Sequence, residues 1–191
     1  MNLAKIFITA FLIDNIVIMR FLALCPFIGM STSEDKSVGM GLAVTFVTVL
    51  ATCVTWPIYK FILEPLGLVF LELLVFILVI AALVQLVEYY LKKSVRGLYS
   101  AMGIYLPLIT TNCAILAVVL ENITKKYTFV ESIVYALGVA LGFLLSLILL
   151  AGIRQRLKVS PIPAFLKGTP ILFICACLLS IAFMGFAGLV K

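Results

Sequence analysis

The sequence lacks histidine altogether and has few charged residues. Without a histidine among its 191 residues, ligation of haem or metal by imidazole and Ser-His catalysis are excluded. Only 12% of the residues are charged and 65% are hydrophobic, whereas about a quarter of a soluble domain is charged. A chain of this size must still show water a polar surface, so a larger core cannot absorb the excess. The composition predicts an integral membrane protein.

Cysteines and basic residues exclude two further classes. The five cysteines are an odd number and all lie in apolar segments, which argues against a disulfide framework. The 14 Lys and Arg residues outnumber 8 acidic ones, but they lie between apolar blocks, as in membrane loops, and do not indicate a nucleic-acid partner. Asp14 and Asn15 interrupt the first apolar run and no small-residue cleavage site follows, so we expect a retained first helix.

Six apolar stretches are long enough to cross a bilayer, which takes about 20 residues in helical form. They are residues 3–27, 38–59, 69–91, 98–120, 128–153 and 170–190. The predicted fold is therefore an all-α protein of six transmembrane helices, a multi-pass protein of the cytoplasmic membrane. The connections are short, so any soluble chemistry belongs to partners.

The distribution of basic residues predicts the orientation. With six spans, five Lys and Arg residues fall on the side of the termini and eight on the other side. The positive-inside rule then places both termini outside. The eight are Lys36, Lys92, Lys93, Arg96, Arg154, Arg156, Lys158 and Lys167.

The six spans divide into two sets of three, residues 1–95 and 96–191. Because three is odd, homologous halves would be inverted relative to each other in the membrane. The second span of each half is glycine-spaced, GMGLAVTF from Gly39 and ALGVALGF from Ala136, and the first span of each half carries polar interruptions. We expect two inverted repeats whose first helix is broken.

The broken spans are candidates for a functional centre near the bilayer midplane. The first contains Asp14, Asn15, Arg20 and then Cys25-Pro26, and the fourth contains Pro107 and the run Thr110-Thr111-Asn112-Cys113. Polar groups at that depth must be satisfied inside the protein. Threonine and asparagine often only join helices together, so the pattern alone leaves that role open.

Cys25 and Cys113 stand at equivalent places in the two broken spans. Thiolates bind zinc and iron–sulfur clusters, and a [2Fe–2S] cluster takes four cysteines. This chain would offer two, which is half a site that a homologous partner could complete. Buried cysteines in membrane helices are often only structural, and we expect that role for Cys53, Cys175 and Cys177.

Four segments resemble one known family: FLALCPFIGMS from Phe21, ILVIAALVQLVE from Ile77, GIYLPLITTNCAIL from Gly103 and AFMGFAGLVK from Ala182. They resemble the membrane subunits of the Rnf and Nqr complexes, over essentially the whole chain. The LCPF form around Cys25 and the short second loop are more similar to the A subunits of Rnf than to the E subunit of the sodium-pumping NADH:quinone oxidoreductase, Nqr.

The resemblance implies a membrane subunit of a bacterial or archaeal complex that passes electrons from ferredoxin to NAD and moves Na⁺ or H⁺. It implies a homologous Rnf E subunit of inverted topology as neighbour, the B, C, D and G subunits of Rnf as further partners, and no independent catalysis. It also implies a [2Fe–2S] cluster shared with that neighbour, with Cys25 and Cys113 as ligands. Pro26, Thr110, Thr111 and Asn112 would surround it.

Ionisable residues within spans are functional candidates by default. Asp14, the deepest acid, is the preferred candidate for ion handling, and it could pair with Arg20 if the helix breaks between them. Glu88 is a second candidate, although an interfacial pair with Lys92 four residues on explains it equally. Glu72, Glu121 and Glu131 lie near span ends, where we expect them to reach headgroup water.

Two other functions fit the repeat pattern or the composition. A secondary transporter with inverted repeats would move a solute without any partner and would not need the cysteines. A purely structural anchor would not need polar breaks in its spans. The cysteines and the resemblance argue against both.

Overall fold

The computed structural model describes residues 3–32, 34–67, 69–94, 109, 112–161, 163 and 166–185. Helices make up the regular structure of these residues, and no strand occurs among them, in agreement with the all-α prediction. In chain order they are α1 (Leu3–Ile8), the π-helix η1 (Thr9–Ile13), α2 (Ile16–Arg20), α3 (Leu24–Met30), α4 (Glu34–Ile58), the π-helix η2 (Tyr59–Leu63), α5 (Glu64–Leu66), the 3₁₀ turn η3 (Val69–Leu71), α6 (Glu72–Ser94), α9 (Cys113–Thr124), α10 (Phe129–Val159) and α11 (Thr169–Met184).

Three of these helical stretches are long and apolar enough to cross a membrane. They are Glu34–Leu63, Glu72–Tyr89 and Phe129–Val159, with 30, 18 and 31 residues, and they correspond to the second, third and fifth predicted spans. Three shorter apolar helices, Leu3–Ile13, Cys113–Thr124 and Thr169–Met184, overlap the other three. Most of the fourth predicted span and the end of the sixth lie outside the described residues. The full six-span arrangement stays a prediction.

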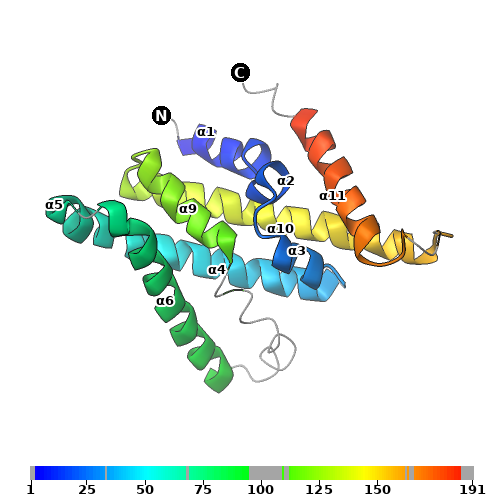
Figure 1. Cartoon of the computed structure of the whole chain (residues 1–191), viewed down its shortest axis with the longest axis horizontal. Helices are drawn as coiled ribbons and strands as arrows, with labels where there is room; N and C mark the ends of the chain where they lie inside the picture. Colours follow the sequence, from blue (N-terminus) through cyan, green and yellow to red (C-terminus); the bar gives the residue numbers. More distant parts are fainter. Residues whose placement is uncertain are drawn as a thin grey trace.

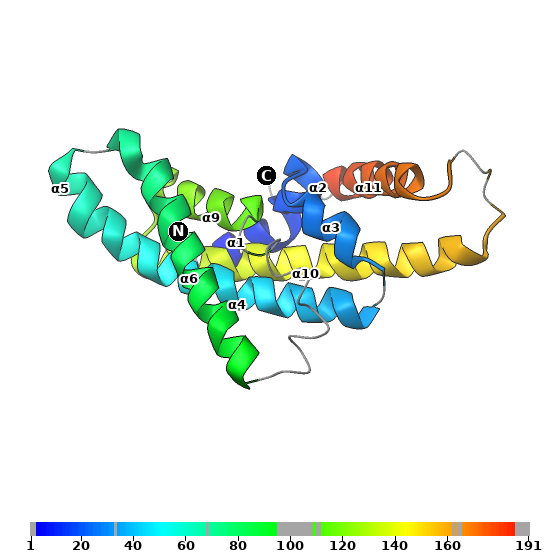
Figure 2. The same cartoon turned by 60° about the horizontal axis from the view of Figure 1, so that its bottom comes forward.

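The centre of the fold is an antiparallel pair of long helices, α4 and α10, which Figures 1 and 2 show side by side. Near one end Gly41 of α4 lies against Leu144 of α10. At the other end the Trp56 indole N–H donates to the carbonyl of Tyr127, 3.1 Å away, just before α10 begins. Between these points the small side chains of α4 let the two backbones approach closely.

Threonines on the inner face of α4 are compatible with burial because their hydroxyls bond to the helix itself. Thr48, Thr52 and Thr55 each donate to the carbonyl four residues earlier, at 2.7 to 2.9 Å. This back-bonding satisfies the hydroxyl without a second helix. A polar residue type can therefore line the contact with α10 at little cost.

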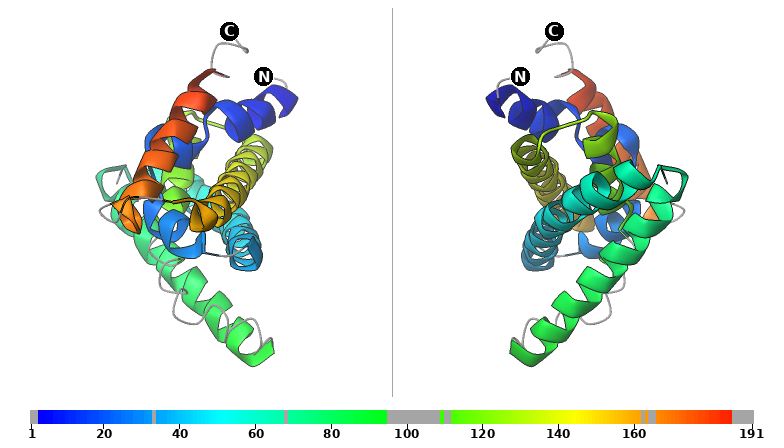
Figure 3. Two further views of the ribbon diagram at one scale, coloured as in Figure 1. Left: turned by 90° about the vertical axis from the view of Figure 1, so that its right-hand side faces the viewer. Right: turned by 90° about the vertical axis from the view of Figure 1, so that its left-hand side faces the viewer.

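The shorter helices pack crosswise between the two halves of the chain. The first broken span, α1, η1 and α2, lies on α10, whereas α9 lies on α4. Helix α11 contacts α10 and α2, and α6 contacts α4 and α9. Helix α6 leans away from the central pair, as Figures 1 and 3 show, and its large apolar side chains are exposed. We expect that surface to face lipid.

Candidate functional site

The first predicted span is broken, as its polar residues predicted. The π-helix η1 ends at Ile13, Asp14 has a non-helical backbone, and α2 starts after Asn15. The side chain of Asn15 caps α2 by accepting from the backbone N–H groups of Val17 and Ile18. A π-turn followed by a capped restart leaves free carbonyls at this depth, and these need partners from elsewhere in the chain.

Asn15 links this break to the middle of α10. Its side chain is fully buried, and its Nδ2 donates to the carbonyl of Gly142 at 2.9 Å and to the hydroxyl of Ser146 at 3.0 Å. The Ser146 hydroxyl in turn donates to the carbonyl of Gly142 at 2.6 Å. All polar atoms of the Asn15 side chain are therefore engaged, which is the condition for a polar residue inside a membrane protein.

Two glycines of α10 make room for the broken span. A Cβ atom on Gly138 would lie 2.9 Å from Cβ of Ala10, and one on Gly142 would lie 2.9 Å from the carbonyl oxygen of Phe11. The glycine spacing in ALGVALGF thus corresponds to a close helix contact. Small residues four apart allow such approach between membrane helices.

A second break follows α2 and leads to Cys25. Phe21 and Ala23 both adopt the left-handed backbone conformation, with φ of 52° and 60°. Helix α3 then starts at Leu24, with Cys25 and Pro26 in its first turn, where proline is tolerated. Non-glycine residues in this conformation cost about 1 kcal/mol or more each, and such strain concentrates at functional sites.

The second break brings Cys25 and Cys113 into one locality. The backbone N–H of Ala23 donates to Sγ of Cys113 at 2.8 Å, and Cys25 follows two residues later. Cys113 is the first residue of α9, and it is half-buried, whereas Cys25 is exposed on the surface of the chain. Figures 1 and 2 show the start of α9 beside the turn from α2 to α3. The two predicted cysteines therefore come together.

The residues around Cys113 are described only in part. Asn112 is buried and caps α9, accepting from the N–H of Ala114 at 3.0 Å, and its own Nδ2 has no hydrogen-bond partner among the described residues. Thr110 and Thr111, which were predicted to lie near the same centre, are outside the described residues. The cap orients the first turn of α9, so it fixes where the sulfur points.

Two thiols and a backbone donor fit half of a metal site. No group of three or more Cys, Asp or Glu residues that could hold a metal occurs in the described part of the chain. The donor set at the break is suited to a shared centre, because an N–H bond to a sulfur is one of the means by which proteins tune iron–sulfur ligands. Cys53, Cys175 and Cys177 lie within α4 and α11, away from the two breaks.

A network of charged residues surrounds the first break. Asp14 pairs with Arg20 and with Lys125, at 3.1 Å in each case. Arg20 and Lys125 also pair with Glu121, and that carboxylate accepts a hydrogen bond from the Tyr135 hydroxyl. The predicted pairing of Asp14 with Arg20 is confirmed. The network joins the first broken span to the end of α9 and the start of α10.

One expectation about the acids is wrong. Glu121 was expected to reach headgroup water, but its side chain is only 14% exposed because it lies within the network. Sequence position could not reveal this, since Arg20 belongs to the other half of the chain. Glu131 does lie at the surface at a helix start, where it accepts from the N–H and hydroxyl of Thr128. Glu88 lies half-buried on α6, outside this network, and the side chain of Lys92 is not described.

Comparisons with known proteins agree on one family. A family model described as "Rnf-Nqr subunit, membrane protein" matches residues 3–190. The A subunit of an ion-translocating oxidoreductase complex from Syntrophotalea carbinolica is 53% identical over 189 residues, 99% of this chain and 98% of that protein. The A subunit of the Na(+)-translocating ferredoxin:NAD(+) oxidoreductase complex of Acetobacterium woodii is 52% identical over the same shares. The corresponding A subunit from Yersinia enterocolitica is 50% identical over 97% of this chain and 96% of its own length.

Proposed function

This chain belongs to the Rnf-Nqr family of membrane subunits, and we propose that it is the A-type subunit of an ion-translocating ferredoxin:NAD oxidoreductase complex. The similarity covers nearly the whole of both chains at 52–53% identity, and the relatives carry that function in their names. Identity of this extent supports the function class more strongly than a shared fold does. The activity is one of the whole complex, and the coupling ion is Na⁺ or H⁺.

Within the complex, Cys25 and Cys113 supply half of the ligands of a [2Fe–2S] cluster. The observation that carries this proposal is the bond from the Ala23 N–H to Cys113 Sγ, which joins the two broken spans at their cysteines. Because Cys25 is exposed, a second protein of the complex can reach its thiol. A cluster bound there would accept and release single electrons inside the membrane. A homologous E subunit of inverted topology would provide the other two thiols.

The residues of this chain would hold that half-site rigid. Asn15 bonds the first break to α10, and Asn112 caps the helix that begins with Cys113. The donor at Ala23 compensates negative charge on the sulfur, which matters because water is excluded at that depth. The buried apolar side chains Phe27 and Ile115 pack nearby on α3 and α9 and exclude solvent from the inner side.

Two inverted repeats, residues 1–95 and 96–191, are part of the same proposal. The crosswise packing supports them: the first helix of each half lies on the second helix of the other half, and α4 and α10 are antiparallel. Six spans with both termini outside the cytoplasmic membrane follow from the sequence pattern. The B, C, D and G subunits of Rnf would complete the complex.

Ion handling at Asp14 and Glu88 is a further part of the proposal. Asp14 already pairs with Arg20 and Lys125, so a cation that approached it would have to displace an internal partner. We expect Asp14 to act through this network rather than as a vacant ligand. Glu88, on α6, would act separately.

The test is electron paramagnetic resonance and iron analysis of the purified complex. Cys25→Ser and Cys113→Ser should each abolish one [2Fe–2S] signal and lower the iron content while all subunits still copurify. Cys53→Ser and Cys177→Ser are matched controls that should keep the signal. Unchanged spectra and iron in both Cys25→Ser and Cys113→Ser would refute the ligand assignment. Solute uptake into liposomes that contain only this chain would instead favour the transporter.

A further inference from the structure

The connection from α10 to α11 concentrates positive charge. Arg154, Arg156 and Lys158 lie in the last turns of α10, and Lys167 precedes α11. The sequence has no Asp or Glu after Glu131. Within the described residues, no carboxylate forms an ion pair with any of these four cations. Their charge therefore has no internal counterpart.

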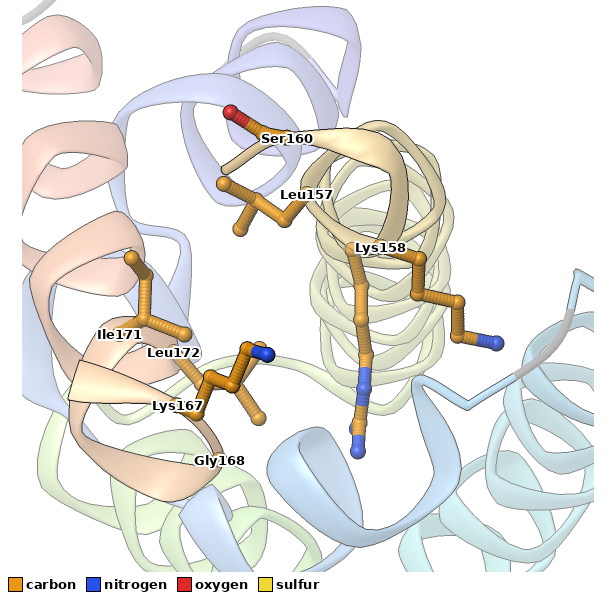
Figure 4. A pocket seen from close by; sticks show the side chains of 8 residues that line it. Leu157, Lys158, Ser160, Lys167, Gly168, Ile171 and Leu172 are labelled. Carbon is orange, nitrogen blue, oxygen red and sulfur yellow. The ribbon is translucent and has the colours of Figure 1, made fainter. Parts of the chain in front are cut away.

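Three of these cations line a cavity between the end of α10 and the start of α11. Its volume is about 290 Å³, many times the roughly 30 Å³ that one water occupies in the liquid. Its walls include Arg154, Lys158 and Lys167, together with Leu157, Ile171 and Leu172. Figure 4 shows the Lys167 ammonium pointing across the space between the two helices, whereas Lys158 extends along the outer side of α10.

Arg154 is held in place at the wall of this cavity. Its Nη1 donates to the carbonyl of Ile28 and to the hydroxyl of Ser31, at 3.1 Å each. Both partners are neutral, so the guanidinium keeps its full charge and its remaining donors. A fixed, planar guanidinium is well suited to bind phosphate oxygens.

The start of α11 adds backbone donors on the other side. Gly168, which lines the cavity, is the N-cap residue, and no side chain caps this helix. The uncapped first turn of a 16-residue helix presents free N–H groups and the positive end of the helix dipole. Gly168 has φ of 103°, a conformation that other residues rarely adopt, so the turn depends on glycine.

The apolar wall distinguishes a lipid from a free ion. Leu157 lies one turn past the predicted hydrocarbon segment of α10, and Ile171 and Leu172 lie in the first turn of α11. The cations thus stand at headgroup level, and apolar side chains lie directly beside them on the bilayer side. By the count of basic residues this is the cytoplasmic leaflet, where basic pockets between helices bind anionic lipid headgroups.

We propose that the cavity between α10 and α11 binds the phosphate of an anionic phospholipid headgroup, with Arg154, Lys158 and Lys167 as its cationic ligands. The acyl chains would lie along Leu157, Ile171 and Leu172. The proposal does not depend on the [2Fe–2S] assignment, because the cavity is formed by other residues. It gives this chain a lipid-binding site in addition to its role in the complex.

The test is native mass spectrometry of the full-length chain in detergent, titrated with phosphatidylglycerol or phosphatidylcholine. The wild type should bind one phosphatidylglycerol in preference to phosphatidylcholine. Removing two cations with Lys158→Gln and Lys167→Gln together should weaken phosphatidylglycerol binding on the order of twentyfold, from roughly fivefold per cation. Helical circular dichroism checks that each variant is folded.

A matched control removes two cations elsewhere. Arg156→Gln and Lys126→Gln together lower the net charge equally but do not line this cavity, so binding should stay within about twofold of wild type. Equal losses in both double variants, or no lipid preference in the wild type, would overturn the proposal. Inorganic phosphate is the third arm: if it displaces phosphatidylglycerol at millimolar concentration, the site binds a free anion and the lipid assignment is wrong.

Discussion

The backbone N–H of Ala23 donates to Sγ of Cys113, 90 residues further along the chain. This bond connects the turn that precedes Cys25 to the first residue of α9. The turn reaches the sulfur because Ala23 takes a left-handed backbone conformation. Local strain and a contact between the two halves of the chain are thus coupled at one peptide unit.

Ala23→Gly is expected to stabilise the chain. An L-residue at φ of 60° costs roughly 1 kcal/mol, which glycine avoids, and the donated N–H remains. Because the N–H is retained, the iron–sulfur spectrum of the complex should not change. We expect an apparent melting temperature about 2–4 °C higher in detergent, measured by circular dichroism. Ala23→Val, with a β-branched side chain, should lower it by a similar amount.

Ala82→Gly provides the control for that substitution. Ala82 is exposed in the middle of α6, where the backbone is helical. Glycine should cost about 1 kcal/mol there and lower the melting temperature. If glycine is destabilising at both positions, Ala23 does not have the left-handed conformation.

Gly142→Ala should separate the first broken span from α10. The added Cβ would lie 2.9 Å from the carbonyl oxygen of Phe11 and 3.3 Å from Nδ2 of Asn15. Since one neighbour is backbone, relief requires movement of the whole segment, at a cost of about 1–3 kcal/mol. The apparent melting temperature should fall, and the yield of iron-containing complex should fall with it.

Gly152→Ala is the matched control, ten residues further along the same helix. Nothing lies within 4 Å of its added Cβ, so alanine should be neutral or stabilising by up to about 1 kcal/mol. Equal effects of the two substitutions would mean that α10 and the broken span are not in close contact at Gly142.

The sequence predicted the kind of site better than its connections. Composition and polar interruptions predicted a membrane helix broken near Asp14, and the paired cysteines predicted one shared locality. These are local signals, because a polar residue in an apolar run is visible without knowing the fold. Asn15 as the link to Ser146, and Lys125 as a partner of Asp14, were missed because no pattern along the chain specifies which residue of another helix faces it.

Helix ends were also predicted imperfectly, for a physical reason. The fifth span was expected to end at residue 153, before the first arginine, yet α10 continues to Val159. Hydrophobicity marks where a helix leaves the hydrocarbon and does not mark where its hydrogen bonding stops. Arg154 stays helical because it bonds back to Ile28 and Ser31 at the end of the first broken span.

Asn15→Leu should be among the most destabilising single substitutions at the break. It removes the cap of α2 and two donors to α10, and it leaves buried N–H groups without partners. A cap contributes about 1 kcal/mol and each orphaned group costs about 1–3 kcal/mol. We expect a loss of at least about 2 kcal/mol in the free energy of unfolding.

Ser146→Ala is the smaller change at the same contact. It removes one hydroxyl, but Asn15 still caps α2 and still donates to Gly142. The expected loss is about 1 kcal/mol. Thermal unfolding of both variants in the same detergent ranks them, and a Ser146→Ala variant as unstable as Asn15→Leu would contradict the assigned role of Asn15.

Arg20 and Glu121 should be energetically coupled across the halves of the chain. Their charges pair directly, and the carboxylate is only 14% exposed, so neither single substitution leaves the partner well solvated. Arg20→Gln and Glu121→Gln together should therefore cost less than the sum of the two single changes, by roughly 1 kcal/mol or more. A double-mutant cycle on melting temperatures measures this coupling.

The control cycle combines Arg20→Gln with Glu131→Gln. Glu131 carries the same charge but lies at the surface and bonds only to Thr128 among the described residues, so its coupling to Arg20 should lie within about 0.5 kcal/mol of zero. Similar values in both cycles would mean that water screens the network. A larger value for Arg20 with Glu121 means that the network holds the first break against α9, the helix that begins with Cys113, and so helps to position both cysteines.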